Sequence, residues 1–125
     1  VRHSIYYDFG AQARTEILEK MGMGMTFMQQ NHIGPVLFKE ECTFRRELHF
    51  GDQVYMDTSL LALTKDGSRY RIEHVFSKAE DIYCAKIIVT GAWIDTQKRK
   101  LKIPPPLALE KMEAWPKAED FEWMQ

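Results

Sequence analysis

The residues nearest the start of the chain are of types that can move protons. His3 is followed by Tyr6 and Asp8, in a segment with helical periodicity. The positive end of a helix dipole disfavours a charged imidazole, so a histidine in the first turn stays neutral near pH 7. A neutral His3 could donate to a carbonyl group or orient an attacking water. Position alone favours a simpler interpretation, in which His3 caps the helix or faces solvent.

Three further side chains near or outside this segment have competing interpretations. Tyr6 lies one turn after His3 on the same side of the helix, where it either lines a pocket or packs in the core. Asp8 falls on the polar face, which favours a solvated surface charge. His74 alternates with apolar residues of a predicted strand, and a lone histidine in that setting is usually a satisfied core group.

Two basic segments could bind an anionic group such as a phosphate. One is "GSRYR" at 67–71, and the other is "QKRK" at 97–100. Each also fits an ordinary solvated turn.

Composition excludes several classes of protein. With 125 residues the chain is predicted to be one domain, and a net charge of −1 argues against nucleic-acid binding. Its apolar runs are too short to span a membrane. Cys42 and Cys84 lie far apart in strand-like contexts, which favours buried thiols of a cytoplasmic protein. No Cys/His cluster has metal-ligand spacing, and we expect neither a metal nor a cofactor.

A helix must carry His3 and Tyr6. Apolar residues recur at steps of three and four up to Met21, and Gly22 suits the position that ends a helix. The period then changes to two, which predicts strands at 36–50, 53–63, 69–77 and 82–95. Asp66-Gly67 predicts a tight hairpin turn.

The predicted strands differ in their apolar faces. In the first strand the even-numbered residues form an apolar face that Glu40 and Arg46 interrupt. The strand at 82–95 is apolar on both faces, which predicts a central position in the sheet. A proline stop and a short helix follow, and residues 116–125 are predicted to be a loosely held C-terminal tail.

These elements predict an α+β domain over residues 1–115. Its four strands would form an antiparallel meander, with the long helix lying across the sheet as its only cover. The other face of the sheet would then be covered by dimerisation.

The motifs resemble those of a known family. "ARTEIL" at 13–18, together with Val1, His3 and Tyr6, is similar to the helix motif of hotdog-fold acyl-CoA thioesterases. The type is that of 4-hydroxybenzoyl-CoA thioesterase, including thioesterases encoded with the Tol-Pal envelope system. "FRRELHFGD" at 44–52 and "WIDTQKRKLKIPPP" at 93–106 resemble further segments of that family. The family motif begins with an aspartate, so the resemblance implies that this residue and a first strand precede Val1.

The resemblance implies a hotdog fold, with a long central helix wrapped by an antiparallel sheet. It implies hydrolysis of an acyl-CoA or acyl-carrier-protein thioester, with the thioester oxygen bound by backbone N–H groups at the helix start. His3 would be catalytic, Tyr6 would line the pocket, and Ser68 and Arg69 would bind the CoA phosphates. The protein would be a cytoplasmic homodimer or dimer of dimers.

Two alternatives remain open from the sequence. A non-catalytic acyl-binding protein fits a chain in which no carboxylate occupies the motif position. A hotdog dehydratase is suggested by "HFGD" at 49–52. His49 lies between two predicted strands, however, whereas dehydratases of this fold carry their histidine before the central helix.

Overall fold

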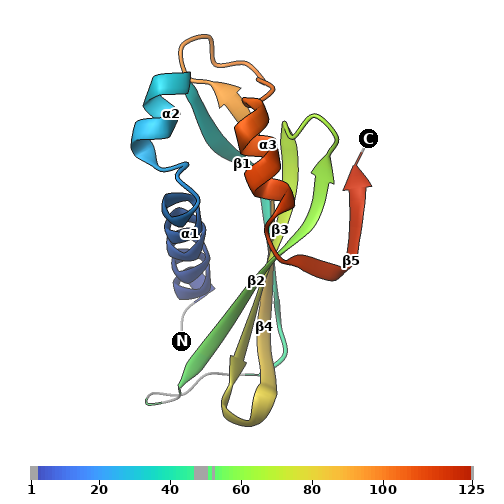
Figure 1. Ribbon diagram of the computed structural model, residues 1–125. Helices are drawn as coiled ribbons and strands as arrows, with labels where there is room; N and C mark the ends of the chain where they lie inside the picture. Colours follow the sequence, from blue (N-terminus) through green and yellow to red (C-terminus); the bar gives the residue numbers. More distant parts are fainter. Residues whose placement is uncertain (1–2, 47–50, 52, 125) are drawn as a thin grey trace.

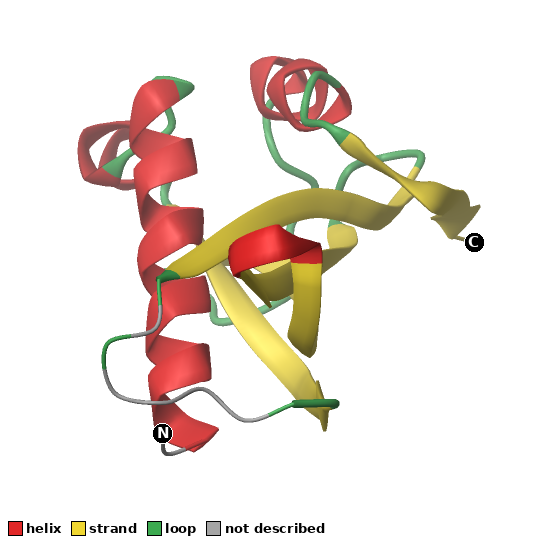
Figure 2. Cartoon of the chain, turned by 90° about the horizontal axis from the view of Figure 1, so that it is seen from below, coloured by secondary structure: helices red, strands yellow, loops and turns green. Residues whose placement is uncertain are grey.

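Two helices come first and a bent sheet follows. The computed structural model describes the backbone of residues 3–46, 51 and 53–124, and the side chains of these residues except 3–8 and 81. Helices α1 (His3–Lys20) and α2 (Met25–Asn31) precede the first strand, and α3 (Pro106–Glu113) lies between the last two (Figure 1). Viewed end-on, the strands are strongly twisted and α1 runs along one side of the sheet (Figure 2). The predicted α+β class is confirmed.

Helix α1 ends where the sequence predicts. Gly22 adopts a left-handed conformation with φ 76°. The N–H of Gly22 donates to the carbonyl of Glu19 at 3.1 Å, and the N–H of Met23 donates to the carbonyl of Leu18 at 2.8 Å. These bonds satisfy two carbonyls that the end of a helix leaves free, and only glycine adopts the required φ without strain.

Five strands form one sheet in the order β1-β4-β3-β2-β5. They are β1 (Ile33–Phe44), β2 (Val54–Thr64), β3 (Arg69–Lys78), β4 (Ile82–Asp95) and β5 (Lys117–Met124). A 3-10 turn, Ala79–Asp81, joins β3 to β4. Strands β2, β3 and β4 form the predicted antiparallel meander, but β1 pairs with β4 instead of β2. Strand β4 is therefore central, as predicted, because it has neighbours on both edges.

Residues 117–124 form strand β5, so the prediction of a loosely held tail is wrong for them. This strand runs parallel to β2 and covers an edge that would otherwise expose unpaired backbone groups. The N–H of Leu60 donates to the carbonyl of Pro116 at 2.7 Å. Phe121 packs against the core and contacts the ring of Trp123 edge-on, at 5.4 Å between centroids.

A bulge in β1 changes which residues face the helix. Leu37 pairs with Gly91 and the next paired residue is Lys39, which leaves Phe38 at the irregularity with 64% of its surface exposed. The predicted apolar face of even-numbered residues is therefore wrong before the bulge. After it, Glu40 lies opposite the fully buried Val89 and shares its face of the sheet. Residues 47–50, the predicted end of this strand, lie outside the described residues.

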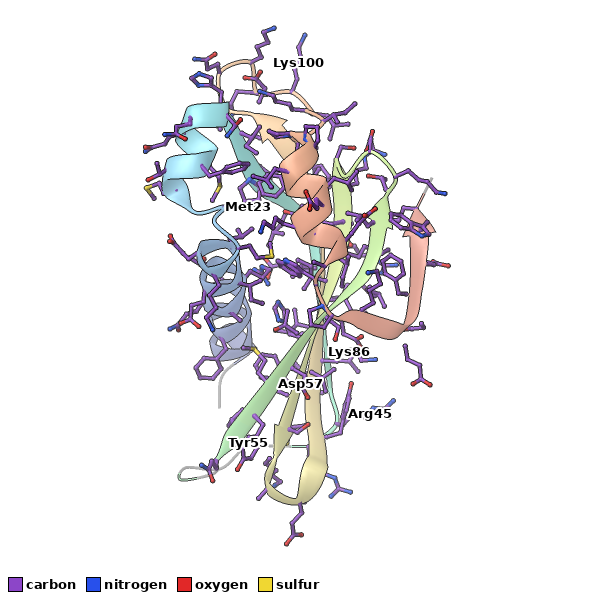
Figure 3. All side chains as sticks on the ribbon, in the orientation of Figure 1. Met23, Arg45, Tyr55, Asp57, Lys86 and Lys100 are labelled. Carbon is purple, nitrogen blue, oxygen red and sulfur yellow. The ribbon has the colours of Figure 1, made fainter. Side chains whose placement is uncertain are left out.

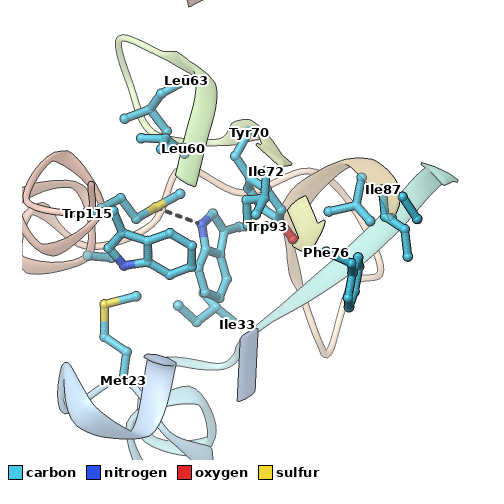
Figure 4. Packing of buried hydrophobic residues seen from close by; sticks show 14 of the residues in the cluster. Met23, Ile33, Leu60, Leu63, Tyr70, Ile72, Phe76, Ile87, Trp93 and Trp115 are labelled. Atoms are coloured by element: carbon cyan, nitrogen blue, oxygen red, sulfur yellow. Dashed lines mark hydrogen bonds between the residues drawn. The ribbon is translucent and has the colours of Figure 1, made fainter. Parts of the chain in front are cut away.

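The core lies between the sheet and two helices. Trp93 is at its centre, 2% exposed, and its indole N–H donates to the sulfur of Met112 at 3.3 Å (Figure 4). Ala108 and Met112 of α3 are both buried, and Trp115 follows them. Helix α1 is thus not the only cover of the sheet, because the short C-terminal helix also packs on the core.

Candidate active site

The first turns of α1 carry the residues predicted to do chemistry. The backbone places His3 at the first position of this 18-residue helix and Tyr6 one turn later. Their side chains lie outside the described residues, so both assignments stay predictions. The first N–H groups of a helix have no carbonyl partner within it, and the helix dipole favours negative charge there.

A polar cluster joins the middle of α1 to the sheet. Arg14 Nη1 lies 2.8 Å from Nε2 of His74, and Nδ1 of His74 lies 2.9 Å from Oγ1 of Thr58. Because a guanidinium only donates, Nε2 accepts and the proton is on Nδ1, which donates to Thr58. Burial, followed by the charge of Arg14, lowers the pKa of His74 to about 4. This confirms the interpretation of His74 as a satisfied core group.

An apolar cavity of about 210 Å³ lies beside this cluster. One wall is the stripe of α1 from Ala11 to Leu18, and the sheet and the α3 region form the others. Helix α1 contributes Ala11, Arg14, Thr15 and Leu18 to this wall. The lining residues outside α1 are Pro35, Leu37, Leu60, Tyr70, Ile72, Trp93, Met112 and Trp115. A cavity of roughly 150 Å³ binds benzene, so this one can hold a ring or a medium-length alkyl chain.

A second hollow lies on another face of α1, nearer its start. Its lining includes Phe9, Glu16, Val54 and Phe76. Phe76 and Ala13 of this hollow are buried, but its other lining residues are not. Half of the lining residues of the cavity are buried: Leu60, Tyr70, Ile72, Trp93, Met112 and Trp115. The cavity is therefore the better place to remove an apolar acyl group from water.

The hairpin between β2 and β3 contains the two residues predicted to bind phosphate. The hydroxyl of Ser68 donates to Oδ1 of Asp66 at 2.7 Å, and the backbone N–H of Ser68 donates to the same oxygen at 2.9 Å. These bonds, and a third from Thr64, lower the pKa of Asp66. Ser68 is 3% exposed, whereas Arg69 is exposed and borders a surface hollow with Lys65. Of the two, Arg69 has the geometry of an anion-binding residue.

The helix start and the hairpin are far apart within one chain. Phe9 of α1 contacts Phe76, with ring centroids 6.4 Å apart. Phe76 lies seven residues from Arg69 on β3, which is about 23 Å of extended strand. In Figure 1 the β2–β3 hairpin lies on the far side of α3 from α1, about level with α2, whereas the chain start is at the lower end of α1. One chain therefore does not bring His3 and Tyr6 together with Ser68 and Arg69.

Sequence reasoning did not single out Arg14 as a functional residue. It was visible only as part of "ARTEIL", in the stripe of α1 that includes Ala11, Thr15 and Leu18. A basic residue beside apolar positions of a helix is a signal that could have identified it.

The described part of the chain contains neither a candidate metal site nor a helix that could cross a membrane. It contains no group of three or more His, Cys, Asp or Glu residues that could hold a metal ion. None of its helices is long and apolar enough to cross a membrane. His49, on which the dehydratase alternative rests, lies outside the described residues.

Comparison with known proteins agrees with this geometry. A family model described as the thioesterase-like superfamily matches residues 1–115. A search of the curated proteins finds no match.

Several solved structures share the fold. A probable thioesterase from Escherichia coli is 23% identical with a TM-score of 0.79, covering 94% of this chain and 86% of that one. A 1,4-dihydroxy-2-naphthoyl-CoA thioesterase from Synechocystis is 15% identical with a TM-score of 0.78, covering 91% and 83%. A Staphylococcus aureus protein in complex with CoA is 13% identical with a TM-score of 0.82, covering 94% and 76%.

The family match covers most of the chain, and the structural matches confirm the predicted hotdog fold. The long helix, the antiparallel strands bent around it and the apolar cavity beside it are the features that these findings connect. The chain belongs to the thioesterase-like superfamily and is a thioester hydrolase.

Proposed function

We propose that this thioesterase hydrolyses acyl-CoA thioesters, with the thioester at the start of α1 and the acyl group in the cavity beside that helix. The cavity of about 210 Å³ along α1 is the observation that carries this proposal. It provides an apolar space next to a helix whose first turn has N–H donors with no partner in the helix, and a histidine. Hydrolysis needs both features, because the acyl chain is apolar and negative charge develops on the thioester oxygen in the transition state, before the CoA thiol leaves.

The chemistry at the helix start follows from the groups there. Backbone N–H groups of the first turn bind the thioester oxygen as it becomes negative, and the helix dipole adds to this stabilisation. His3, kept neutral by the same dipole, orients the attacking water or donates to the carbonyl. Tyr6 lines the pocket one turn further on.

We also propose that the active form is a homodimer in which each site combines two chains. The distance of about 23 Å along β3 between Phe76 and Arg69 supports this, because one chain presents the two halves of the site separately. Arg69, and Ser68 beside it, would then bind the CoA phosphates for the partner. A neighbouring fold that was solved in complex with CoA supports CoA as the carrier. Acyl-carrier-protein thioesters are the alternative.

The compartment is part of the same proposal. Cys42 and Cys84 are both free thiols, and Cys84 is fully buried. Unpaired cysteines suit a reducing environment, which supports the cytoplasm.

Replacing His3 by alanine is expected to lower kcat/KM for acyl-CoA hydrolysis by roughly tenfold to a thousandfold. The reason is the loss of a group that donates to the carbonyl or orients the water. Thiol release from a panel of short, long and aromatic acyl-CoAs measures it.

His32→Asn is the matched control. His32 is exposed at the end of α2 with φ 53°, a conformation that asparagine tolerates. It should retain full activity. Equal rates for His3→Ala and the unchanged protein would contradict the catalytic role of His3. A folded protein that releases no thiol from any acyl-CoA would favour the acyl-binding alternative.

The shared site predicts complementation between two inactive variants. His3→Ala and Arg69→Glu are each impaired, but a heterodimer of the two contains one site with both changes and one with neither. After random mixing of the chains, activity should return to about a quarter of the normal value. The measurement is thiol release before and after the two variants are unfolded and refolded together. A mixture no more active than the mean of its parents would show that each site belongs to one chain.

A further inference from the structure

Arg14 places a positive charge at the wall of an apolar cavity. Among the residues that the structure describes, no carboxylate forms an ion pair with it. Its hydrogen-bond partner is the neutral imidazole of His74, at 2.8 Å. The carboxylate of Glu40 attracts the charge of Arg14 through space. Glu40 lies on the face of the sheet that carries the buried Val89, but its own side chain is exposed. A partly buried cation that hydrogen-bonds to a neutral group, and whose opposite charge through space is an exposed carboxylate, is costly, so its retention calls for an explanation.

The surroundings of Arg14 leave room for an anion. Burial lowers the pKa of Arg14, while Glu40 and Tyr70 oppose this effect. No fully buried side-chain nitrogen or oxygen of the described residues lacks a hydrogen-bond partner. The guanidinium nitrogens other than Nη1 are therefore open to the cavity or to solvent. Most other cavity walls are aliphatic or aromatic.

The guanidinium is also held in position. A hydrogen bond to Thr58 fixes the orientation of the His74 ring, and Nε2 of His74 accepts a hydrogen bond from Nη1 of Arg14. Gly10 allows the helix to approach at this point, because a Cβ there would lie 3.1 Å from Cδ2 of His74 and 3.2 Å from Nη1 of Arg14. A donor that is oriented before the ligand arrives loses little entropy on binding.

We propose that Arg14 binds a carboxylate on the far end of the acyl group, so that the preferred substrates are CoA monothioesters of dicarboxylic acids. The planar guanidinium matches a carboxylate with two parallel N–H donors, whereas a terminal methyl group would leave the charge unpaired. The inference rests on the proposed function, because it specifies the substrate of that same site.

The distance along α1 sets the length of the acyl group. Arg14 lies eleven residues after His3, but its Nη1 lies 3.2 Å from the Cβ position of Gly10. The guanidinium is therefore near a residue only seven positions after His3, which is about 10 Å along the helix axis. Eleven residues are close to three full turns, so the two positions share one face of the helix. A short dicarboxylic chain cannot reach from the helix start to the guanidinium, and the preference should grow with chain length.

The test compares matched pairs of acyl groups that differ only at the far end. These are succinyl with butyryl, adipoyl with hexanoyl, and suberoyl with octanoyl. Thiol release gives kcat/KM for each CoA ester, and calorimetry with non-hydrolysable thioether analogues measures binding without turnover. We expect suberoyl to be preferred over octanoyl by roughly tenfold to a hundredfold in both assays, because one end gains a charge-assisted contact.

Arg14→Gln should reduce that preference to about unity, because the amide keeps a donor near His74 but has no charge. Arg45→Gln is the matched control, since Arg45 is exposed at the end of β1, on the lower part of the sheet (Figure 3). It should keep the full preference. Arg14→Lys keeps the charge and should keep part of the preference, which guards against a variant that merely folds poorly.

Each other outcome overturns the inference. Equal binding of suberoyl and octanoyl analogues by the unchanged protein would refute it and leave acyl-CoA hydrolysis intact. An Arg14→Gln variant that loses activity on all esters alike would show a structural role for Arg14. Failure to bind or hydrolyse any ester would refute the proposed function, and the inference with it.

Discussion

Replacing Trp93 by alanine is expected to lower the free energy of unfolding by about 3–5 kcal/mol, because the loss of so large a buried side chain leaves a void that its neighbours fill only in part. Trp93 is 2% exposed and packs against Tyr70, with ring centroids 6.2 Å apart. Its indole N–H also donates to Met112 of α3. Native domains have only about 5–15 kcal/mol of stability, so this loss would take a large share of it.

Urea unfolding followed by far-ultraviolet circular dichroism measures the effect of Trp93→Ala. The matched control is Trp123→Ala on β5, since Trp123 is 41% exposed and contacts Phe121 by its edge. The same substitution there should cost less than about 1 kcal/mol. Similar losses at both positions would mean that the stability does not depend on the core between the sheet and α3.

Lowering the pH from 6.5 to 4 is expected to destabilise the protein by about 3 kcal/mol through His74 alone. In the unfolded chain this histidine has its ordinary pKa of 6.5, whereas burial and then Arg14 lower the pKa to about 4 in the folded protein. Within this window the unfolded chain therefore binds a proton that the folded protein does not. At about 1.4 kcal/mol per pH unit, the gap amounts to about 3 kcal/mol. The contribution is fully present above pH 6.5 and is lost on the way down to 4.

The measurement is urea unfolding at a series of pH values between 7 and about 4. The comparison is with His74→Gln, which keeps a polar group near Arg14 but cannot titrate. Hydrogen bonds lower the pKa values of Asp66 and Asp95, so their contribution to stability falls in acid in both proteins. The difference in unfolding free energy between the two proteins therefore isolates the effect of His74. Parallel curves for the two proteins would show that His74 is not buried in its neutral form.

Local signals in the sequence predicted the helix end and the hairpin correctly. Gly22 and Gly67 both have positive φ, at 76° and 80°, where the turn chemistry places them. The position of β4 inside the sheet also agrees with its own residues, because a strand that is apolar on both faces is more often inside a sheet than at its edge. Such features depend on a few adjacent residues, and these residues are visible in the sequence.

Pairing between distant segments was not predictable in the same way. The sequence does not show that β1 pairs with β4 and not with β2, because the edge of any strand of matching length and apolar character could accept it. Strand β5 lacks a period-two pattern and exists because β2 has an open edge beside it. The short helix α2 was also missed, since its seven residues are too few for a clear period.

For the site, the sequence by itself determined which chemical groups are present and which family they belong to. Histidine at the start of a helix, the "ARTEIL" motif and an exposed arginine after a hairpin all follow from residue types and short spacings. Only the tertiary structure decided that Arg14, Thr58 and His74 meet beside one cavity, which Arg14 lines, and that Arg69 lies far from the helix start. The physical reason is that a side chain's chemistry is its own, whereas a contact across 60 residues depends on how closely a helix packs on its sheet.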